Sequence, residues 1–269
     1  VEGLIRSTVF DHFCGGVNEV DCLRVVDKMY TKGVSSVLDY SVEGKEEEAQ
    51  FDAALNMTLK TIEFAREREA IPFAVFKPTG FGRLALYEKV GDKAHLTENE
   101  QKEWNRVIER FDIACKTAFE KDVLLLIDAE ESWMQDAADA IVTDMMRKYN
   151  KQKAIVFNTL QMYRWDRLDY LKNLHEQAKS EGFYIGMKLV RGAYMEKEND
   201  RATERGLKSP ICVSKEATDI NYDAAVLYMI DNINKMAIFA GTHNEESSYK
   251  LMQLMAEKGI TKNDKRIFF

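Results

Sequence analysis

The chain has 269 residues, 45% of them hydrophobic, and its 45 acidic residues outnumber 38 basic ones for a formal net charge of −7. This length suits one large domain or two ordinary ones, and the apolar content is sufficient for a hydrophobic core. The acidic balance and the lack of a basic run argue against general nucleic-acid binding. No apolar stretch approaches the ~20 residues that a membrane-spanning helix needs.

Residues 4–34 predict a leading helical segment, so we divide the chain into this segment at 1–34 and a larger domain at 35–269. Asn18 is a suitable N-cap for a helix that ends near Gly33. The apolar residues behind this cap recur at helical spacing and predict one buried face: Cys22, Val25, Val26 and Met29.

From residue 35 onward, short apolar segments alternate with helical ones. The predicted strands are 36–40, 73–77, 123–128, 154–157, 184–189, 236–240 and 266–269. Helices are predicted between them at 46–69, 134–149, 166–180, 219–234 and 245–257, and behind a capping box formed by Thr97 and Glu100. A loop is expected at 80–82 and a polar loop before 219.

This uninterrupted alternation indicates a parallel sheet with crossover helices, and nothing in the composition marks a further domain boundary. Seven strands with their helices predict an α/β fold, a (βα)8 TIM-like barrel whose last strand and helix are absent from this sequence. A doubly wound open sheet is the alternative architecture.

Polar residues gather where the predicted strands end, whereas the strand bodies are apolar. In a parallel sheet these carboxyl ends share one rim, which is where barrel enzymes place their active sites. The rim residues are Asp39, Lys77, Asp128, Asn158, Gln161, Lys188, Arg191, Thr242, His243 and Asn244. Glu130 and Glu131 are instead expected in a solvated loop or a salt bridge.

The residue types on this rim restrict its chemistry. One histidine and two carboxylates among several cations make a poor metal site, so no metal is expected. Thr242 and His243 are adjacent in sequence and make no convincing nucleophile–base pair. Cations and amides suit an anionic ligand with a hydrogen-bonding ring system, and a flavin is such a ligand.

The segment 80–85, Gly-Phe-Gly-Arg-Leu-Ala, matches the G-x-G-x-x-A dinucleotide fingerprint directly after a predicted strand. The fingerprint requires a βαβ unit of about 30 residues, and the next predicted strand begins well beyond that, near Val123. Pro78 also interrupts the tight turn. We therefore reject a dinucleotide site here.

The segment 188–194, Lys-Leu-Val-Arg-Gly-Ala-Tyr, resembles the signature of proline dehydrogenases. Segments 13–16, 38–44, 127–131 and 242–245 resemble further motifs of the stand-alone, mitochondrial-like branch, in the same order. The resemblance covers nearly the whole chain. It implies a (βα)8 barrel that binds FAD at the strand carboxyl ends. It also implies oxidation of L-proline to Δ1-pyrroline-5-carboxylate by hydride transfer to flavin N5, the first step of proline catabolism.

The resemblance also implies roles for individual residues. Lys77 and Asp128 would line the proline site, and Tyr194 would pack against the proline ring with Leu189. Lys188 would stabilise negative charge on reduced flavin near N5 and O4. The implied FAD contacts are Gln161, Lys188, Val190, Arg191, Gly192, Ala193, Thr242, His243 and Asn244, with Lys215 as a candidate for the phosphates.

In this family, electrons pass to a membrane quinone, so the resemblance implies peripheral membrane association. The expected location is the bacterial cytoplasm at the inner face of the membrane, or the matrix face of the mitochondrial inner membrane. No signal-peptide pattern begins at Val1, so secretion is not expected.

Family members continue into a strand and a helix whose tyrosine and paired arginines grip the proline carboxylate. The sequence ends at Phe269 before them, and we expect the natural polypeptide to continue further. Three alternatives stay open. They are a hydroxyproline dehydrogenase, a flavin-binding barrel without turnover, and a lyase or aldolase that uses Lys77 or Lys188.

Overall fold

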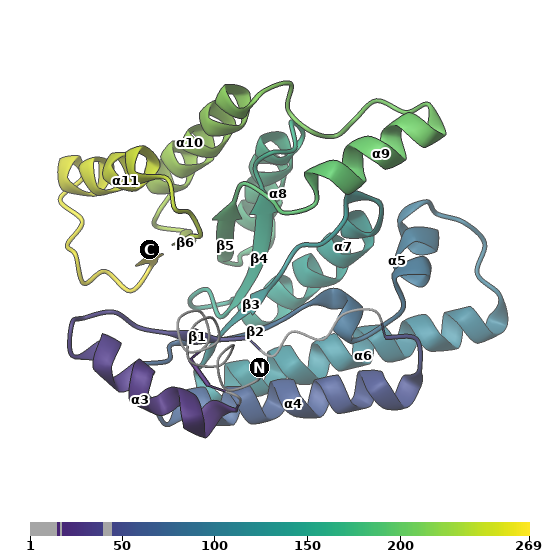
Figure 1. The fold of residues 1–269 in the computed structure, drawn as a ribbon, viewed down its shortest axis with the longest axis horizontal. Coiled ribbons are helices and arrows are strands. Elements are labelled where there is room, and N and C mark those ends of the chain that lie inside the picture. The colour runs from purple at the N-terminus through teal and green to yellow at the C-terminus, as the bar shows by residue number, and fades with distance from the viewer. Residues whose placement is uncertain (1–14, 17, 40–44) are drawn as a thin grey trace, which may run out of the picture.

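Seven parallel strands form one sheet whose order follows the chain from β1 to β7 (Figure 1). The structure, a computed structural model, describes residues 15–16, 18–39 and 45–269. Predictions that fall on residues 1–14, 17 and 40–44, including the start of the leading segment, lie outside the described residues. The sequential order confirms the barrel-type prediction, because a doubly wound sheet reverses its strand order at a switch point.

The strands are β1 (Val37–Leu38), β2 (Phe73–Phe76), β3 (Leu124–Ile127), β4 (Val156–Gln161), β5 (Ile185–Val190), β6 (Met236–Ala240) and β7 (Ile267–Phe268). β4 differs most from its prediction at 154–157. Its polar half continues as strand because Asn158 to Gln161 pair in register with Met187 to Val190 of β5. Pairing with an apolar neighbour therefore overrides the weak strand propensity of that segment.

The described helices are α3 (Glu19–Tyr30), α4 (Glu48–Arg66), η2 (Pro78–Gly80), α5 (Leu84–Gly91), α6 (Glu98–Lys121), α7 (Ser132–Tyr149), α8 (Arg167–Glu181), α9 (Met195–Arg205), α10 (Lys215–Asp231) and α11 (Glu245–Glu257). Helices α5 and α9 were not predicted from the sequence. In α9 only Glu198 and Ala202 are buried, so its sequence carries almost no apolar stripe. α10 begins earlier than predicted because Ser214 caps it at the Ala217 N–H.

Two predicted helix caps are confirmed. The Asn18 side chain accepts a hydrogen bond from the Asp21 N–H at 2.9 Å. Thr97 and Glu100 form the expected capping box at the start of α6. The predicted buried face of α3 is only partly right, because Val26 is its one described buried residue and Met29 is 40% exposed.

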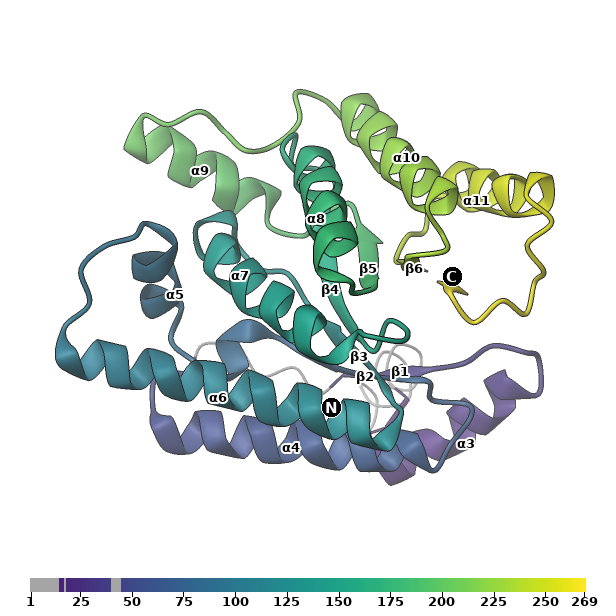
Figure 2. The ribbon, with the colours of Figure 1, turned by 180° about the vertical axis from the view of Figure 1, so that it is seen from behind.

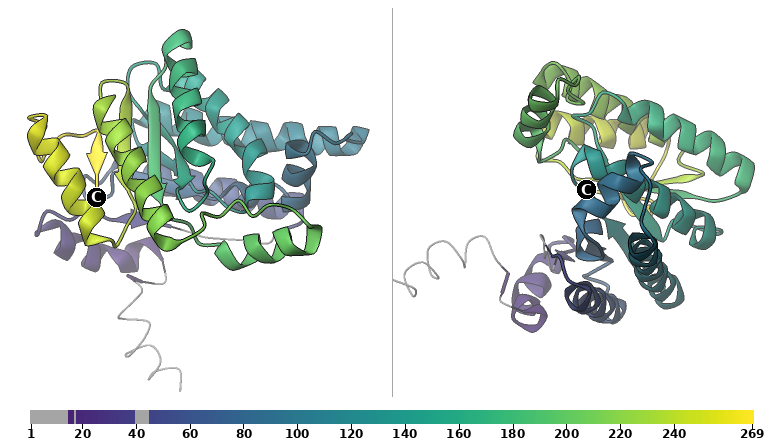
Figure 3. Two further views of the ribbon diagram at one scale, coloured as in Figure 1. Left: turned by 90° about the horizontal axis from the view of Figure 1, so that it is seen from above. Right: turned by 90° about the vertical axis from the view of Figure 1, so that its right-hand side faces the viewer.

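The helices lie along one face of a curled sheet, so the sheet forms a half-barrel (Figures 1 and 2). Seen from above, α10 and α11 lie next to each other beside the last strands (Figure 3). The main core fills the space between this face and the helices and includes Leu125, Ile127, Met187 and Leu189. No described helix combines the length and apolar character needed to cross a membrane.

A smaller apolar cluster occupies the inner, concave face of the sheet. The Phe73 ring makes edge contacts with the rings of Phe157, Phe239 and Phe268 at centroid separations of 5.4, 5.2 and 4.7 Å. Phe73 opens β2 and Phe157 lies near the start of β4, so these rings fill the amino-terminal part of the inner face. The carboxyl-terminal part is therefore available for polar residues.

Candidate functional site

A pocket of about 600 Å³ opens at the carboxyl ends of the strands, a volume within the usual range for small-molecule sites. Every predicted site residue except Leu189 lines it: Lys77, Asp128, Gln161, Lys188, Val190, Arg191, Gly192, Ala193, Tyr194, Lys215, Thr242, His243 and Asn244. Ala129, Thr159 and Gly241, which the sequence analysis did not single out, complete the lining.

Strand geometry explains which side chains reach the pocket. Successive side chains of a strand point to opposite faces, so Thr159 and Gln161 on β4 share the inner face with Lys188 and Val190 on β5. Leu189 therefore points the other way and is fully buried in the main core. This orientation gives no support to the predicted contact of Leu189 with a substrate ring.

Two further rim residues do not line the pocket. The Asn158 side chain turns to the helix layer, where its Nδ2 donates to Asp139 Oδ1 of α7 at 2.8 Å. The prediction that Asn158 faces the site is therefore wrong, because the residue belongs to β4 rather than to a loop after it. Asp39 is exposed beyond the two-residue strand β1 and is not part of the lining.

Asp128 lies between two lysines at one end of the pocket. Its Oδ1 is 2.6 Å from Lys188 Nζ, and its Oδ2 is 3.7 Å from Lys77 Nζ. All three side chains are between 16% and 19% exposed, so their charges are only partly screened by water. Two cations against one carboxylate leave a net positive charge, which favours an anionic group such as a ligand carboxylate.

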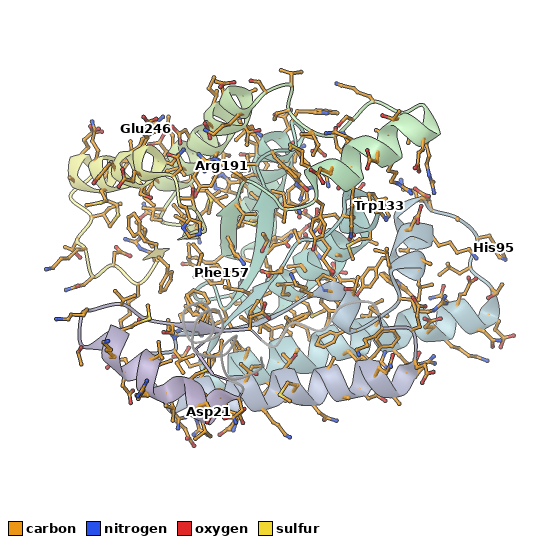
Figure 4. All side chains as sticks on the ribbon, in the orientation of Figure 1. Asp21, His95, Trp133, Phe157, Arg191 and Glu246 are labelled. Atoms are coloured by element: carbon orange, nitrogen blue, oxygen red, sulfur yellow. The ribbon has the colours of Figure 1, made fainter. Side chains whose placement is uncertain are left out.

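Arg191 is held by contacts with four other side chains. Its guanidinium donates to Asp219 Oδ1 at 2.6 Å, to Thr242 Oγ1 at 2.8 Å and to Ser247 Oγ at 3.0 Å. The same group lies 4.5 Å from the centre of the Tyr222 ring. Figure 4 shows Arg191 and Phe157 near opposite ends of the central strands. These contacts fix the guanidinium beside the pocket before any ligand arrives.

A second positive region lies where α10 and α11 begin. Asn244 caps α11 by accepting from the Ser247 N–H at 3.0 Å. Lys215 Nζ lies 2.7 Å from Asp219 Oδ2, and its hydrogen bond, with that of Arg191, keeps the pKa of Asp219 below its ordinary range. A capped helix N-terminus beside two cations is well suited to phosphate groups.

Two glycines bring bare backbone to the pocket wall. Gly192 has φ of +130°, and a Cβ there would lie 2.4 Å from the Tyr163 ring. A Cβ on Gly241 would lie 3.0 Å from Val190 Cγ1 and 3.2 Å from the Leu189 carbonyl oxygen. Glycine at both positions therefore lets the pocket wall pack closely against Tyr163, Val190 and Leu189.

Glu130 corrects one sequence-based expectation. It is 3% exposed rather than solvated, and its carboxylate accepts from the Thr79 N–H at 2.9 Å and from Thr79 Oγ1 at 2.6 Å. Glu131 does form a salt bridge, with Lys197 at 3.1 Å. The sequence offered no signal for the Glu130 contact, because Thr79 is 51 residues away.

Burial raises the pKa of Glu130 from its ordinary 4.5 to about 7. Between those values the folded chain keeps a proton that the unfolded chain has lost, so stability falls as pH rises through this window. We expect Glu130→Gln to remove this pH dependence, in which the free energy of unfolding falls by at most about 3 kcal/mol across the window. Urea unfolding at pH 5 and pH 7.5 measures it. Glu120→Gln, at an exposed position of α6, serves as the control. If the stability of Glu130→Gln depended on pH as that of the wild type does, Glu130 would not be the group with the raised pKa.

A model of the proline dehydrogenase family matches residues 22–269. The chain is 35% identical over 251 residues to the carbapenem antibiotics biosynthesis protein CarD of Pectobacterium carotovorum subsp. carotovorum, covering 93% of this chain and 66% of that protein. It is 37% identical over 186 residues to mitochondrial proline dehydrogenase 1 of Drosophila melanogaster, covering 65% of this chain and 27% of that protein.

A solved structure agrees with the fold. Proline utilization A from Bdellovibrio bacteriovorus, inactivated by N-propargylglycine, superimposes with a TM-score of 0.81 at 19% identity, over 97% of this chain and 28% of that one. The chain thus spans only part of each of these relatives. The family match nevertheless extends over almost the whole sequence, including every residue that lines the pocket. The chain therefore belongs to the proline dehydrogenase family.

Proposed function

We propose that this chain binds FAD in the strand-end pocket and oxidises L-proline to Δ1-pyrroline-5-carboxylate. Membership of the proline dehydrogenase family supports the reaction. The observation that carries the assignment is the single pocket that holds the Lys77–Asp128–Lys188 cluster together with Arg191 and the start of α11. One region suits a small carboxylate, and the other suits a cofactor with phosphates.

The residues present fit FAD. Arg191, Lys215 and the N-terminus of α11 would hold its pyrophosphate, since they combine cations with the positive end of a helix dipole. Gln161 and Lys188 would donate to the ring system, with Gly192 and Gly241 in the pocket wall beside it. FAD, when bound, supplies the acceptor for the hydride that leaves C5 of proline.

The protein binds and orients the substrate in this proposal. Lys77 attracts the proline carboxylate, and Asp128 holds Lys77 and Lys188 at a defined separation. Tyr194, half-buried at the start of α9, offers an aromatic wall for the pyrrolidine ring. Positioning the reacting carbon in this way lowers the entropic part of the activation free energy for proline oxidation.

We propose a membrane quinone as the electron acceptor, reached through peripheral association with the membrane. Relatives that are named mitochondrial support a mitochondrial location, which we propose to be the matrix face of the inner membrane. The inner face of a bacterial membrane is the corresponding proposal if the chain comes from a bacterium, as its relative CarD does.

Absorption spectroscopy of the purified protein tests the function. We expect a flavin spectrum that bleaches when L-proline is added without oxygen, and we expect acid precipitation to release all the yellow colour. Hydroxyproline, added in a parallel sample, distinguishes the two substrates. Flavin that neither amino acid bleaches would indicate a barrel without turnover. A colourless protein that does not bind added FAD would overturn the proposal.

A further inference from the structure

Glu130 joins two strand ends that carry proposed substrate residues. Its carboxylate accepts both hydrogen bonds that Thr79 can donate, from the backbone N–H and from Oγ1. Thr79 lies in η2, two residues after Lys77, and Glu130 lies two residues after Asp128. The pair therefore ties the loop after β2 to the loop after β3.

The main chain of Glu130 reaches a third strand end. Its carbonyl oxygen accepts from Gln161 Nε2 at 3.0 Å, and Gln161 is the last residue of β4. Its N–H donates to Gln135 Oε1 of α7 at 3.0 Å. Every polar group of Glu130 is thus bonded to a different part of the site's support.

We propose that Glu130 is a positioning residue. Through Thr79 and Gln161 it sets the spacing of the three strand ends that present Lys77, Asp128 and Gln161 to the pocket. The kinetic consequence of this inference rests on the proposed oxidation of proline. Glu130 does not line the strand-end pocket, so it acts through its neighbours rather than on a ligand.

The groups around Glu130 act on its charge in opposite directions. Burial disfavours its charged form, Lys77 favours that form, and Glu131 opposes it. An adjacent pocket of about 340 Å³ also brings Lys45, Glu46, Tyr194 and Lys197 near it. The buried Tyr87 lies within electrostatic range. A buried carboxylate costs more than an apolar residue of similar size, so its two-sided contact with Thr79 points to a role in geometry.

Thr79 offers matched variants for the test. Thr79→Val keeps the shape but removes the Oγ1 donor, and Thr79→Ser keeps that donor. We expect Thr79→Val to raise the KM for proline about tenfold with a smaller change in kcat, because misplaced binding groups weaken substrate binding first. Thr79→Ser should restore KM to within about twofold of wild type. Thr117→Val, which removes a hydroxyl on the exposed face of α6, should leave both constants unchanged.

Combination with Glu130→Gln makes the test specific. Because the two residues act as one unit, the double variant Glu130→Gln/Thr79→Val should raise KM no more than the larger single change. Additive effects, or a Thr79→Val protein with wild-type KM, would overturn the inference. If Thr79→Val does not fold, Thr79→Ala, which also lacks the Oγ1 donor, takes its place in the same comparison with Glu130→Gln.

Crystal structures of Thr79→Val and Thr79→Ser provide a readout that does not need turnover. In Thr79→Val the loops after β2 and β3 should separate, and the 3.7 Å approach of Lys77 Nζ to Asp128 should lengthen. In Thr79→Ser both should stay in place. If the wild-type protein does not oxidise proline, only the proposed function is wrong. The positioning role is then supported or rejected by this comparison.

Discussion

Lys188→Met is expected to slow the reduction of the bound flavin by proline about 100-fold, because it removes a fixed charge beside the developing negative charge. Methionine preserves the unbranched shape and most of the length of the side chain. The change also leaves Asp128 with Lys77 at 3.7 Å as its nearest described cation, in place of Lys188 at 2.6 Å. The reduction potential of the flavin should fall, since the reduced form loses a stabilising cation. Stopped-flow reduction without oxygen and a redox titration measure the two effects.

Lys148→Met is the matched control for this change. Lys148 Nζ also lies 2.6 Å from a carboxylate, that of Asp112, but this pair is on the outer surface of the helices. Surface ion pairs contribute at most about 1 kcal/mol, so the control should keep its rate and potential. If Lys188→Met behaved like the control, Lys188 would not lie beside the reacting ring.

The sequence predicted the site better than it predicted the orientation of individual side chains. The rim was found because apolar strands of a parallel sheet end at one edge, whatever their exact register. Orientation depends on where each strand begins and on a period of two. Because β4 continues to residue 161 rather than ending at 157, Asn158 belongs to the strand, and its side chain faces the helices rather than the pocket. Leu189 lies between Lys188 and Val190, which both face inward, so the period of two places it on the opposite face, although all three residues had been predicted to belong to the site.

Other elements escaped the sequence analysis because their stability comes from distant contacts. α9 is polar on almost every side, and it is held through Glu198, which accepts from the Ser132 N–H at the start of α7 at 2.6 Å. Glu130 is likewise buried only because Thr79 approaches from another strand end. Hydrophobic periodicity cannot reveal such polar contacts, since they follow no local spacing.

Gly192→Ala is expected to destabilise the fold by about 2–5 kcal/mol, the range associated with strained backbone and overpacking in a rigid environment. A Cβ at this position would lie between 2.4 and 2.6 Å from three atoms of the Tyr163 ring. The ring cannot withdraw easily. Tyr163 is 4% exposed, its N–H donates to the Arg191 carbonyl at 2.7 Å, and its own carbonyl accepts from the Cys212 N–H at 2.6 Å. Arg191 would therefore shift, and flavin affinity should fall as well.

Gly206→Ala separates backbone strain from the steric clash. Gly206 ends α9 with φ of +63°, but a Cβ there meets nothing within 4 Å. The left-handed conformation alone costs about 1–2 kcal/mol for alanine, so Gly206→Ala should show only that loss in urea unfolding. The excess loss in Gly192→Ala then combines the clash with Tyr163 and the greater backbone strain at φ of +130°. Adding Tyr163→Ala to Gly192→Ala should recover part of that excess, because the two positions are coupled. Equal losses for the two glycine variants would mean that the loop after β5 yields freely, and Arg191 would then not be rigidly placed for a cofactor.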